Sequence, residues 1–318
     1  MTMLRRRTVL SLLALLPLAS FAQNPASTLR IGYQKSSTLL TILKVRGQLE
    51  QDLAPLGVKV SWHEFSSGLP LLEALNVGGV DLSADVADTV PVFAQAAGAQ
   101  LTYFAQEAPS PSAQAIVVRA DSPIASVADL KGKKVAVTKA AGSHYLLIAA
   151  LDKVGLRFKD IEPAYLSPAD GRAAFERGSV AAWVTWDPYL AGVQRQSTVR
   201  ILADGRDTAD YQRYYLAATA YAQARPDVLA VVFEALRKTG KWVKQAPKEA
   251  AELLAPAWGL DAKTVELANG RRSYDVRLVV KDALGEQQRI ADAFFAEGLL
   301  PRKLDATAVP LWRGKAAP

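Results

Sequence analysis

The sequence predicts an α/β protein of two domains, each a mostly parallel sheet flanked by helices. Strand and helix patterns alternate along the chain from residue 29 onward. The chain has 318 residues, half of them apolar, which is ample for two hydrophobic cores. A segment rich in Pro and Ser at 108–112 interrupts the alternation, so we place a domain boundary there.

The first unit begins after a short linker. Its strands are predicted from short apolar runs, one with clear period-two alternation, and its helices end near Pro55 and at Gly78. The predicted strands are 29–34, 58–65, 80–83 and 101–106, and the predicted helices are 39–53, a segment that carries Leu71, Leu72 and Leu75, and 89–97.

The second unit repeats this pattern, and the chain then returns to the first. Strands are predicted at 115–118, 134–137, 161–166, 181–185 and 199–203, with helices within 123–130, from the polar cluster at 140–144 to about 154, and at 168–177. A return strand at 214–219 precedes helices at 226–245, 248–257, 262–268 and 281–297. We therefore expect one lobe from residues 23–114 and 217–318, a second lobe from 115–216, and a hinge of two crossing strands.

The first 22 residues have the pattern of a cleavable secretory signal. Arg5, Arg6 and Arg7 precede an apolar run at 9–18, and small residues favour cleavage after Ala22. A retained membrane anchor is the alternative, but the apolar run is short for one. The arginines also resemble a twin-arginine signal, yet no cofactor motif calls for folded export, so we prefer the general secretory route. These features predict a secreted, periplasmic protein.

Composition excludes several classes of function. The chain has no cysteine, so we expect no disulfide, no thiolate metal site and no lipid-anchored N-terminus. The net charge of +7 falls to +4 when the three signal arginines leave, and no dense basic run predicts nucleic-acid binding. Motifs for nucleotide binding, serine hydrolysis and zinc proteolysis are missing from the sequence. We expect no cofactor, no metal and no catalysis.

Polar residues cluster where predicted strands end and helices begin. In open α/β sheets ligands bind at this edge, and the free N–H groups of a helix N-terminus attract anions. For each cluster the alternative is an ordinary helix N-cap. The candidate ligand-binding residues are Gln34, Ser36, Ser37, Ser67, Gly68, Asp85, Asp88, Gly142, Ser143, His144, Trp186 and Asp187.

Three of these candidates have strong alternatives. His144 is either a donor to an anion, a pH-sensitive group, or a histidine satisfied by local hydrogen bonds. Trp186 suits the core and equally an aromatic wall for a ligand's carbon chain. Asp187, which precedes Pro188, has the chemistry of a helix N-cap.

Segments spread over nearly the whole mature chain match a family pattern. They are 30–35 (RIGYQK), 72–81 (LEALNVGGVD), 93–98 (FAQAAG), 127–134 (VADLKGKK), 143–144 (SH), 165–175 (YLSPADGRAAF) and 186–189 (WDPY). Taken together, they resemble the periplasmic aliphatic-sulfonate-binding proteins of ABC importers, part of a wider group that binds taurine, nitrate and thiamine precursors. The resemblance implies a type II periplasmic-binding-protein fold whose cleft closes on the ligand. It also implies headgroup contacts from Gln34, Ser36, Gly68, Asp88, Ser143, His144, Trp186 and Asp187.

Two positions depart from the family pattern. Ser36 stands where the family usually has glycine, and the segment 83–88 is one residue longer, with an additional Asp85. An unpaired carboxylate beside a sulfonate would be repulsive. Asp85 therefore points away, pairs with Lys35 or another base, or the ligand differs from a simple alkanesulfonate.

The residues and the resemblance together predict a monomeric solute-binding protein that captures small aliphatic sulfonates and delivers them to a membrane permease. Taurine, a sulfone or another small anion or zwitterion is the alternative ligand. A thiamine-precursor-related enzyme on the same fold is a remote alternative, because its cysteine-rich iron-binding segment has no counterpart here. A signalling or scavenging role without a transporter is a third possibility.

Overall fold

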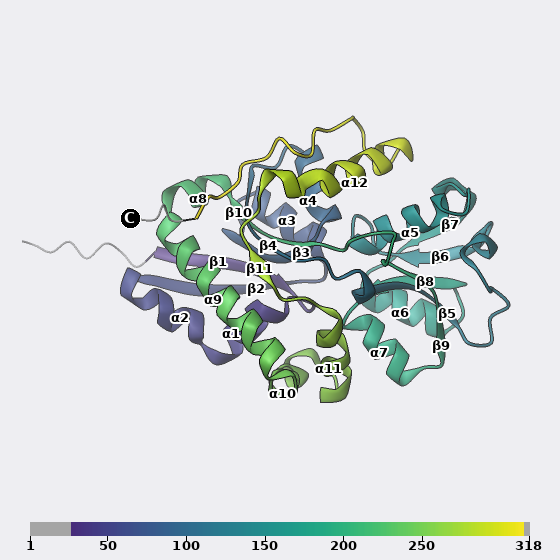
Figure 1. Ribbon diagram of the computed structural model, residues 1–318, viewed down its shortest axis with the longest axis horizontal. Coiled ribbons are helices and arrows are strands. Elements are labelled where there is room, and N and C mark those ends of the chain that lie inside the picture. The colour runs from purple at the N-terminus through teal and green to yellow at the C-terminus, as the bar shows by residue number, and fades with distance from the viewer. Residues whose placement is uncertain (1–26, 315–318) are drawn as a thin grey trace, which may run out of the picture.

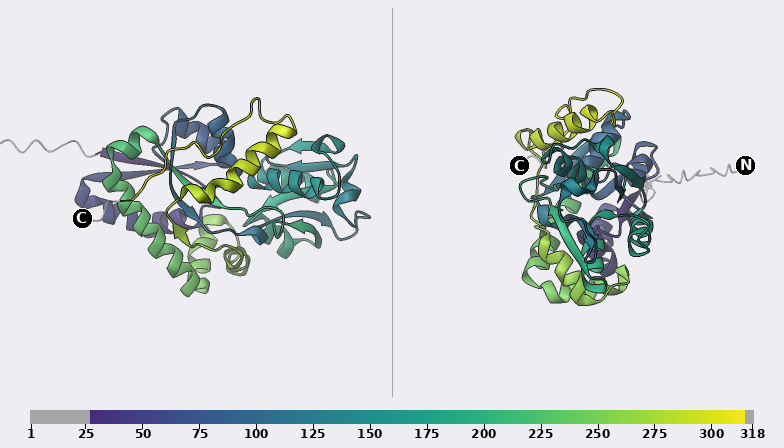
Figure 2. Two further views of the ribbon diagram at one scale, coloured as in Figure 1. Left: turned by 45° about the horizontal axis from the view of Figure 1, so that its top comes forward. Right: turned by 90° about the vertical axis from the view of Figure 1, so that its right-hand side faces the viewer.

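The structure is a computed structural model that describes residues 27–314, and it consists of two α/β lobes side by side (Figure 1). The predicted signal segment lies outside these residues. Each lobe has its own sheet, and the last helix lies along the junction of the lobes in both views of the long axis (Figures 1 and 2). No helix among residues 27–314 is both long and apolar enough to cross a membrane.

Sheet A, in the first lobe, has six strands in the order β11-β4-β10-β3-β1-β2. β1 pairs in parallel with β2 and β3, and β10 runs antiparallel between β3 and β4. The bounds are β1 (Ser27–Gln34), β2 (Val58–Phe65), β3 (Leu82–Ala87), β4 (Leu101–Glu107), β10 (Arg213–Ala218) and β11 (Val276–Arg277).

Sheet B, in the second lobe, has five strands in the order β7-β6-β8-β5-β9. β6 pairs in parallel with β7 and β8, whereas β5 runs antiparallel between β8 and β9. The bounds are β5 (Gln114–Arg119), β6 (Lys134–Val137), β7 (Glu162–Tyr165), β8 (Ala182–Trp186) and β9 (Val199–Asp204). In each sheet four strands run one way and the strand that enters from the other lobe runs against them; in sheet A the short edge strand β11 also runs against the four.

Two chain crossings connect the lobes. β4 continues through the short helix η2 (Pro111–Ala113) into β5, and β9 returns through residues 205–212 to β10. The crossings are bonded to each other, because Gly205 N–H donates to the Pro111 carbonyl and Ser110 N–H donates to the Asp210 carbonyl, each at 3.0 Å. The connection is therefore a two-stranded strap.

Helices cover both faces of each sheet. Their bounds are α1 (Thr38–Arg46), α2 (Gln48–Leu53), α3 (Gly68–Asn76), α4 (Thr89–Ala96), α5 (Gly142–Asp152), α6 (Pro168–Glu176), α7 (Tyr189–Gln196), α8 (Thr219–Ala224), α9 (Pro226–Gln245), α10 (Pro247–Trp258), α11 (Ala262–Arg271) and α12 (Gly285–Ala296), with one-turn helices η1 (Ala54–Leu56), η3 (Val127–Leu130), η4 (Phe158–Asp160) and η5 (Lys281–Leu284).

The cores of the two lobes are joined by α12. In the second lobe, Leu147 of α5 packs in one cluster with Ile116 of β5, and this cluster also includes Phe294 of α12. Phe294 also makes an edge-to-face contact with Phe93 of α4, with ring centroids 4.9 Å apart. Each fully buried side chain of this size contributes about 1.5–3 kcal/mol. Because α12 contacts α4 and α5, it links the first lobe to the second.

Three local predictions were wrong. The third strand covers residues 82–87, not 80–83, so Asp85 lies inside it. The helix predicted at 39–53 is broken by Gly47, which has φ 61° and caps α1. Helix α7 begins after Pro188, which occupies the N-cap position predicted for Asp187. Asp187 instead accepts from the N–H of Ala191, in the first turn.

Candidate functional site

A small cavity lies between the lobes, at the strand ends of both sheets. Its lining comes from the first lobe, the return crossing and the second lobe: Gln34, Gly68, Ala87, Val90, Ala141, Gly142, Trp186, Tyr211 and Arg213. Its volume is about 10 Å³, room for about one water molecule. Hollows of about 300–840 Å³ lie elsewhere on the outer faces, and none of them is lined by a candidate residue.

Two helix N-termini reach this cavity from opposite lobes. Gly68 is the first residue of α3, Gly142 is the first residue of α5, and within the described residues neither helix has a side-chain cap. Neither position has room for a side chain: a Cβ at Gly142 would lie 2.7 Å from the Tyr211 ring, and one at Gly68 would lie 2.9 Å from Val90. The exposed N–H ends favour an anion between them.

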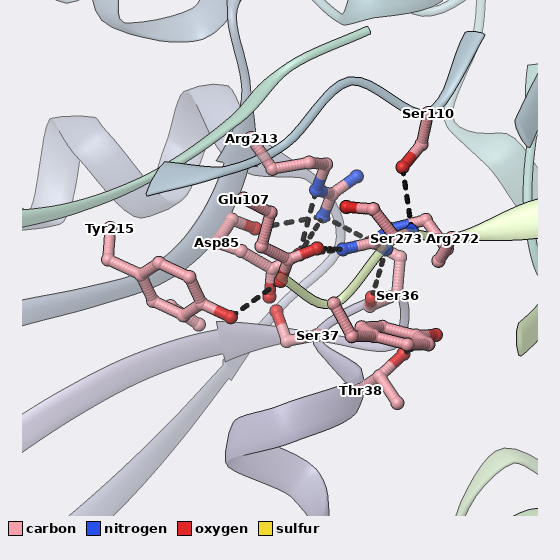
Figure 3. Close-up of polar contacts among 12 residues, drawn as sticks. Ser36, Ser37, Thr38, Asp85, Glu107, Ser110, Arg213, Tyr215, Arg272 and Ser273 are labelled. Carbon is pink, nitrogen blue, oxygen red and sulfur yellow. Dashed lines mark hydrogen bonds and ion pairs between the residues drawn. The ribbon is translucent and has the colours of Figure 1, made fainter. Parts of the chain in front are cut away.

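Asp85 belongs to a buried cluster of charges (Figure 3), which includes the cavity-lining residue Arg213. Its Oδ2 lies 2.6 Å from Arg213 and 3.0 Å from Arg272, and Arg272 also lies 2.5 Å from Glu107. Tyr215 donates to the other oxygen of Glu107. The two positive charges of the guanidinium groups are therefore offset by the two negative charges of the carboxylates. Burial lowers the pKa of Arg213, but Asp85, with smaller effects of Tyr211 and Glu107, opposes burial, and the pKa is raised overall.

Ser36 and Asp85, the two positions that depart from the family pattern, both contact Arg213. Its Nη2 donates to Ser36 Oγ at 3.3 Å, and its Nε donates to Asp85 at 2.7 Å. Arg213 also donates to the hydroxyl of Tyr211, and burial raises the pKa of Tyr211 to about 12. Asp85 thus pairs with arginines that are distant in sequence, and not with Lys35.

Sequence analysis missed Tyr211 and Arg213 as cavity residues. Neither belongs to a recognisable motif: Tyr211 lies on the return crossing and Arg213 is the first residue of β10, just before the return strand predicted at 214–219. One signal was available: an arginine begins an otherwise apolar strand, β10, in a position where only a buried partner would stabilise it.

Four serines among the candidates have different surroundings. Ser36 supports Arg213, and Ser37 Oγ accepts from Gln34 N–H. Ser67 lies at the N-cap of α3, but its side chain does not cap that helix. Ser143 is fully buried in the first turn of α5, and its hydroxyl has no partner within the described residues.

Asp88 has the structure of a helix cap. Its carboxylate accepts from the N–H groups of Thr89 and Gln212, which fixes the start of α4 against the return crossing. Burial raises the pKa of Asp88 to about 7, against the effect of these two hydrogen bonds. Asp88 is not part of the cavity lining.

His144 points into an aromatic cluster and does not line the cavity. Its ring centroid lies 4.9 Å from those of Phe158 and Phe294, and its Nδ1 accepts from Ala140 N–H. Burial, with a smaller effect of Lys139, lowers the pKa of His144 to about 3. The imidazole is therefore neutral at physiological pH.

Trp186 and Asp187 have separate roles at the end of β8. Trp186 lines the cavity, whereas Asp187 Oδ1 and Oδ2 each accept from Arg271 of α11 at 3.1 Å. Burial raises the pKa of Asp187 to about 7, although Arg271 opposes this shift. Because α11 packs on α10 of the first lobe, this ion pair joins the two lobes.

The arrangement can bind a small anion, and the described residues contain no cluster of side chains suited to a metal ion. Of the twelve candidates, Gln34, Gly68, Gly142 and Trp186 are brought together at the cavity. The other eight surround it as buried or structural neighbours. Two α/β lobes that share a cavity at their strand ends define the class of periplasmic solute-binding proteins.

The chain belongs to the NMT1/THI5-like family, whose model matches residues 55–250. It is 41% identical, over 300 residues and 93% of each chain, to a protein of Escherichia coli (strain K12) named as an aliphatic sulfonates-binding protein.

Solved structures of such proteins have the same fold. The alkanesulfonate-binding protein SsuA from Xanthomonas axonopodis pv. citri, bound to MOPS, is 38% identical and superposes with a TM-score of 0.83, covering 89% of this chain and 97% of that one. The periplasmic aliphatic sulphonate binding protein SsuA from Escherichia coli is 41% identical, with a TM-score of 0.81 and coverage of 90% and 98%.

Proposed function

We propose that this protein is the periplasmic solute-binding component of an ABC importer and that it captures small aliphatic sulfonates between its lobes. The names of its relatives support the ligand class. The proposal includes export through the signal at residues 1–22, a monomeric state and no catalysis.

One observation carries the ligand class: the N-termini of α3 and α5 meet at one cavity from opposite lobes. A sulfonate has three acceptor oxygens and carries its charge at all ordinary pH values. Uncapped N–H groups on two sides can therefore share it. Trp186 and Val90 add apolar surface at the same cavity for the carbon chain.

The small size of the cavity implies that the two lobes move relative to each other when a ligand binds. A space of about 10 Å³ is too small for even a short alkanesulfonate, so the lobes must separate for a ligand to enter. The strap of residues 108–113 and 205–212 is where such a rotation would occur, because within residues 27–314 the main chain passes between the sheets only there. Binding energy would then favour closure.

The pairing of Asp85 removes the main objection to a simple sulfonate. Its carboxylate contacts two guanidinium groups and is not part of the cavity lining. Arg213, which does line the cavity, remains cationic. A zwitterion is therefore not needed to offset a free acidic group.

The test is calorimetric titration of the mature protein, residues 23–318, with C2 to C8 alkanesulfonates, taurine, a sulfate ester and nitrate. We expect one-to-one binding of at least one alkanesulfonate, tighter than binding of nitrate. No binding across the panel would overturn the ligand class. Recovery of a chemically altered ligand would overturn the non-catalytic part.

Delivery to an importer is tested in cells. Loss of the gene should abolish growth on the bound sulfonate as the only sulfur source and leave growth on sulfate intact. Unchanged growth on both sources would instead favour a scavenging or signalling role without a transporter.

A further inference from the structure

Gln114, the first residue of β5, has an unusual environment. The residue is fully buried, yet neither the nitrogen nor the oxygen of its side-chain amide has a hydrogen-bond partner within the described residues. Among the described side-chain amides, it is the one whose nitrogen and oxygen are both buried without a partner. Since unpaired buried amides are costly and rare, this side chain calls for a partner from outside the chain.

The strand register places Gln114 beside the cavity. Gln114 is directly opposite Trp186 in the antiparallel ladder of β5 and β8, and directly opposite residues share one face of a sheet. Ile116 and Val184 lie on that same face and pack with α5. Gln114 is therefore a neighbour of Trp186 at the sheet edge where α5 begins.

Ser143 brings a second unpaired donor to this edge. It follows Gly142, which lines the cavity, in the first turn of α5. Its side chain is fully buried, and its hydroxyl has no partner within residues 27–314. A side-chain amide, a hydroxyl and an uncapped helix start thus gather on one side of the second lobe.

We propose that Gln114 Nε2 donates a hydrogen bond to the anionic group of the ligand in the closed protein, next to Ser143 Oγ, which the family resemblance already implies as a headgroup contact. This rests on the proposed function, and it names the part of the headgroup site that the second lobe contributes. The amide oxygen of Gln114 accepts, so a ligand with a hydroxyl or ammonium group near its sulfonate satisfies both ends of the amide.

The test measures affinity for ethanesulfonate, 2-hydroxyethanesulfonate and taurine in Gln114→Leu and Ser143→Ala proteins, together with the thermal midpoint of the ligand-free proteins. We expect each variant to lose about tenfold or more in affinity, with no lower midpoint, because the change removes an unpaired polar group. The loss in Gln114→Leu should be larger for the two ligands that carry a donor.

Thr185→Val is the matched control. Thr185 Oγ1 is also buried and unpaired within the described residues, but Thr185 lies opposite Ala115 on the other face of sheet B, towards α6. Its replacement should leave affinity within about threefold. Gln114→Asn, which withdraws the amide by one carbon, serves if Gln114→Leu fails to fold, and it should also lose affinity.

The outcomes separate the two proposals. If the natural protein binds neither these three ligands nor any other member of the C2 to C8 panel, the proposed function fails and takes this inference with it. If the natural protein binds and Gln114→Leu binds equally well, only the inference is overturned. A loss of affinity that Thr185→Val shares, or that comes with an equal loss of stability, also overturns it.

Discussion

Asp85 and Arg213 form an ion pair with a 2.6 Å separation, and each side chain is at most 1% exposed. Arg272 shares the same carboxylate oxygen, and Glu107 offsets the second guanidinium group. The cluster connects β3, β4 and β10 with the segment that follows α11. It therefore fixes Arg213 where the return crossing meets the cavity.

Asp85→Asn should destabilise the protein by about 3–5 kcal/mol, because two buried guanidinium groups would then share one carboxylate. The free energy of unfolding in urea measures this. Asp275→Asn is the control, since Asp275 pairs with Arg277 on the surface and should cost less than about 1 kcal/mol. An equal loss of unfolding free energy in the two variants would show that the buried cluster stabilises the protein no more than the surface ion pair does.

Arg271→Met should weaken ligand binding by about tenfold or more, because it leaves Asp187 buried without its cation when the lobes close. Calorimetry with the best-bound sulfonate measures the change. Arg195→Met removes a more exposed pair, between α7 and Asp261 at the N-cap of α11, and should change affinity by less than about threefold. Unaltered affinity in Arg271→Met would mean that this pair does not favour closure.

Gly142→Ala should lower ligand affinity by about tenfold or more, since the new Cβ would lie 2.7 Å from Tyr211 and 3.0 Å from Ala87. The clash exists only when the lobes are close together, so the stability of the ligand-free protein should change little. Gly285→Ala is the control: its Cβ meets nothing within 4 Å, and its helical position should gain about 0.5–1 kcal/mol. Full affinity in Gly142→Ala would contradict close packing at this site.

His144→Phe tests the pH dependence. The folded pKa of about 3 lies below the unfolded value of about 6.5, so the unfolded state alone takes up a proton as the pH falls through this range. The stability that the neutral ring contributes is full above pH 6.5 and is lost below it, by about 2 kcal/mol at pH 5.

Phe cannot take up this proton, although it costs a constant amount because Ala140 N–H loses its acceptor. The difference in unfolding free energy between natural protein and variant should therefore shift by about 2 kcal/mol in favour of the variant between pH 7 and pH 5. A difference that does not change with pH would place the ring in contact with water. Ligand affinity at pH 7 should be preserved, since the ring does not line the cavity.

Regular elements were predictable where local signals agreed. α9 occupies residues 226–245 as predicted, because Pro226 begins the helix and an apolar face persists along it. The helix predicted at 39–53 failed at Gly47, since its apolar spacing continues through the break. The strand predicted at 80–83 failed for the opposite reason: Asp85 is disfavoured in strands until a distant arginine pairs with it.

The location of the candidate site, at the strand ends of the sheets, could be predicted from the sequence, but the contacts between its residues could not. The rule that ligands bind at strand ends led to Gln34, Gly68, Gly142 and Trp186, which do line one cavity. The partners of Asp85 lie 128 and 187 residues away in sequence, and no local pattern could connect them. Gln114 was overlooked because a glutamine at the start of a strand is ordinary until its burial is known.

The place of β10 constrains the order in which the molecule can be assembled. β10 lies between β3 and β4 in the middle of sheet A, yet in a chain that emerges N-terminus first it follows all five strands of sheet B. Sheet A therefore remains divided during synthesis, while the second lobe can complete its own sheet first. A lesion that delays folding of the second lobe would leave the first lobe open at its centre, with unpaired edges exposed to aggregation.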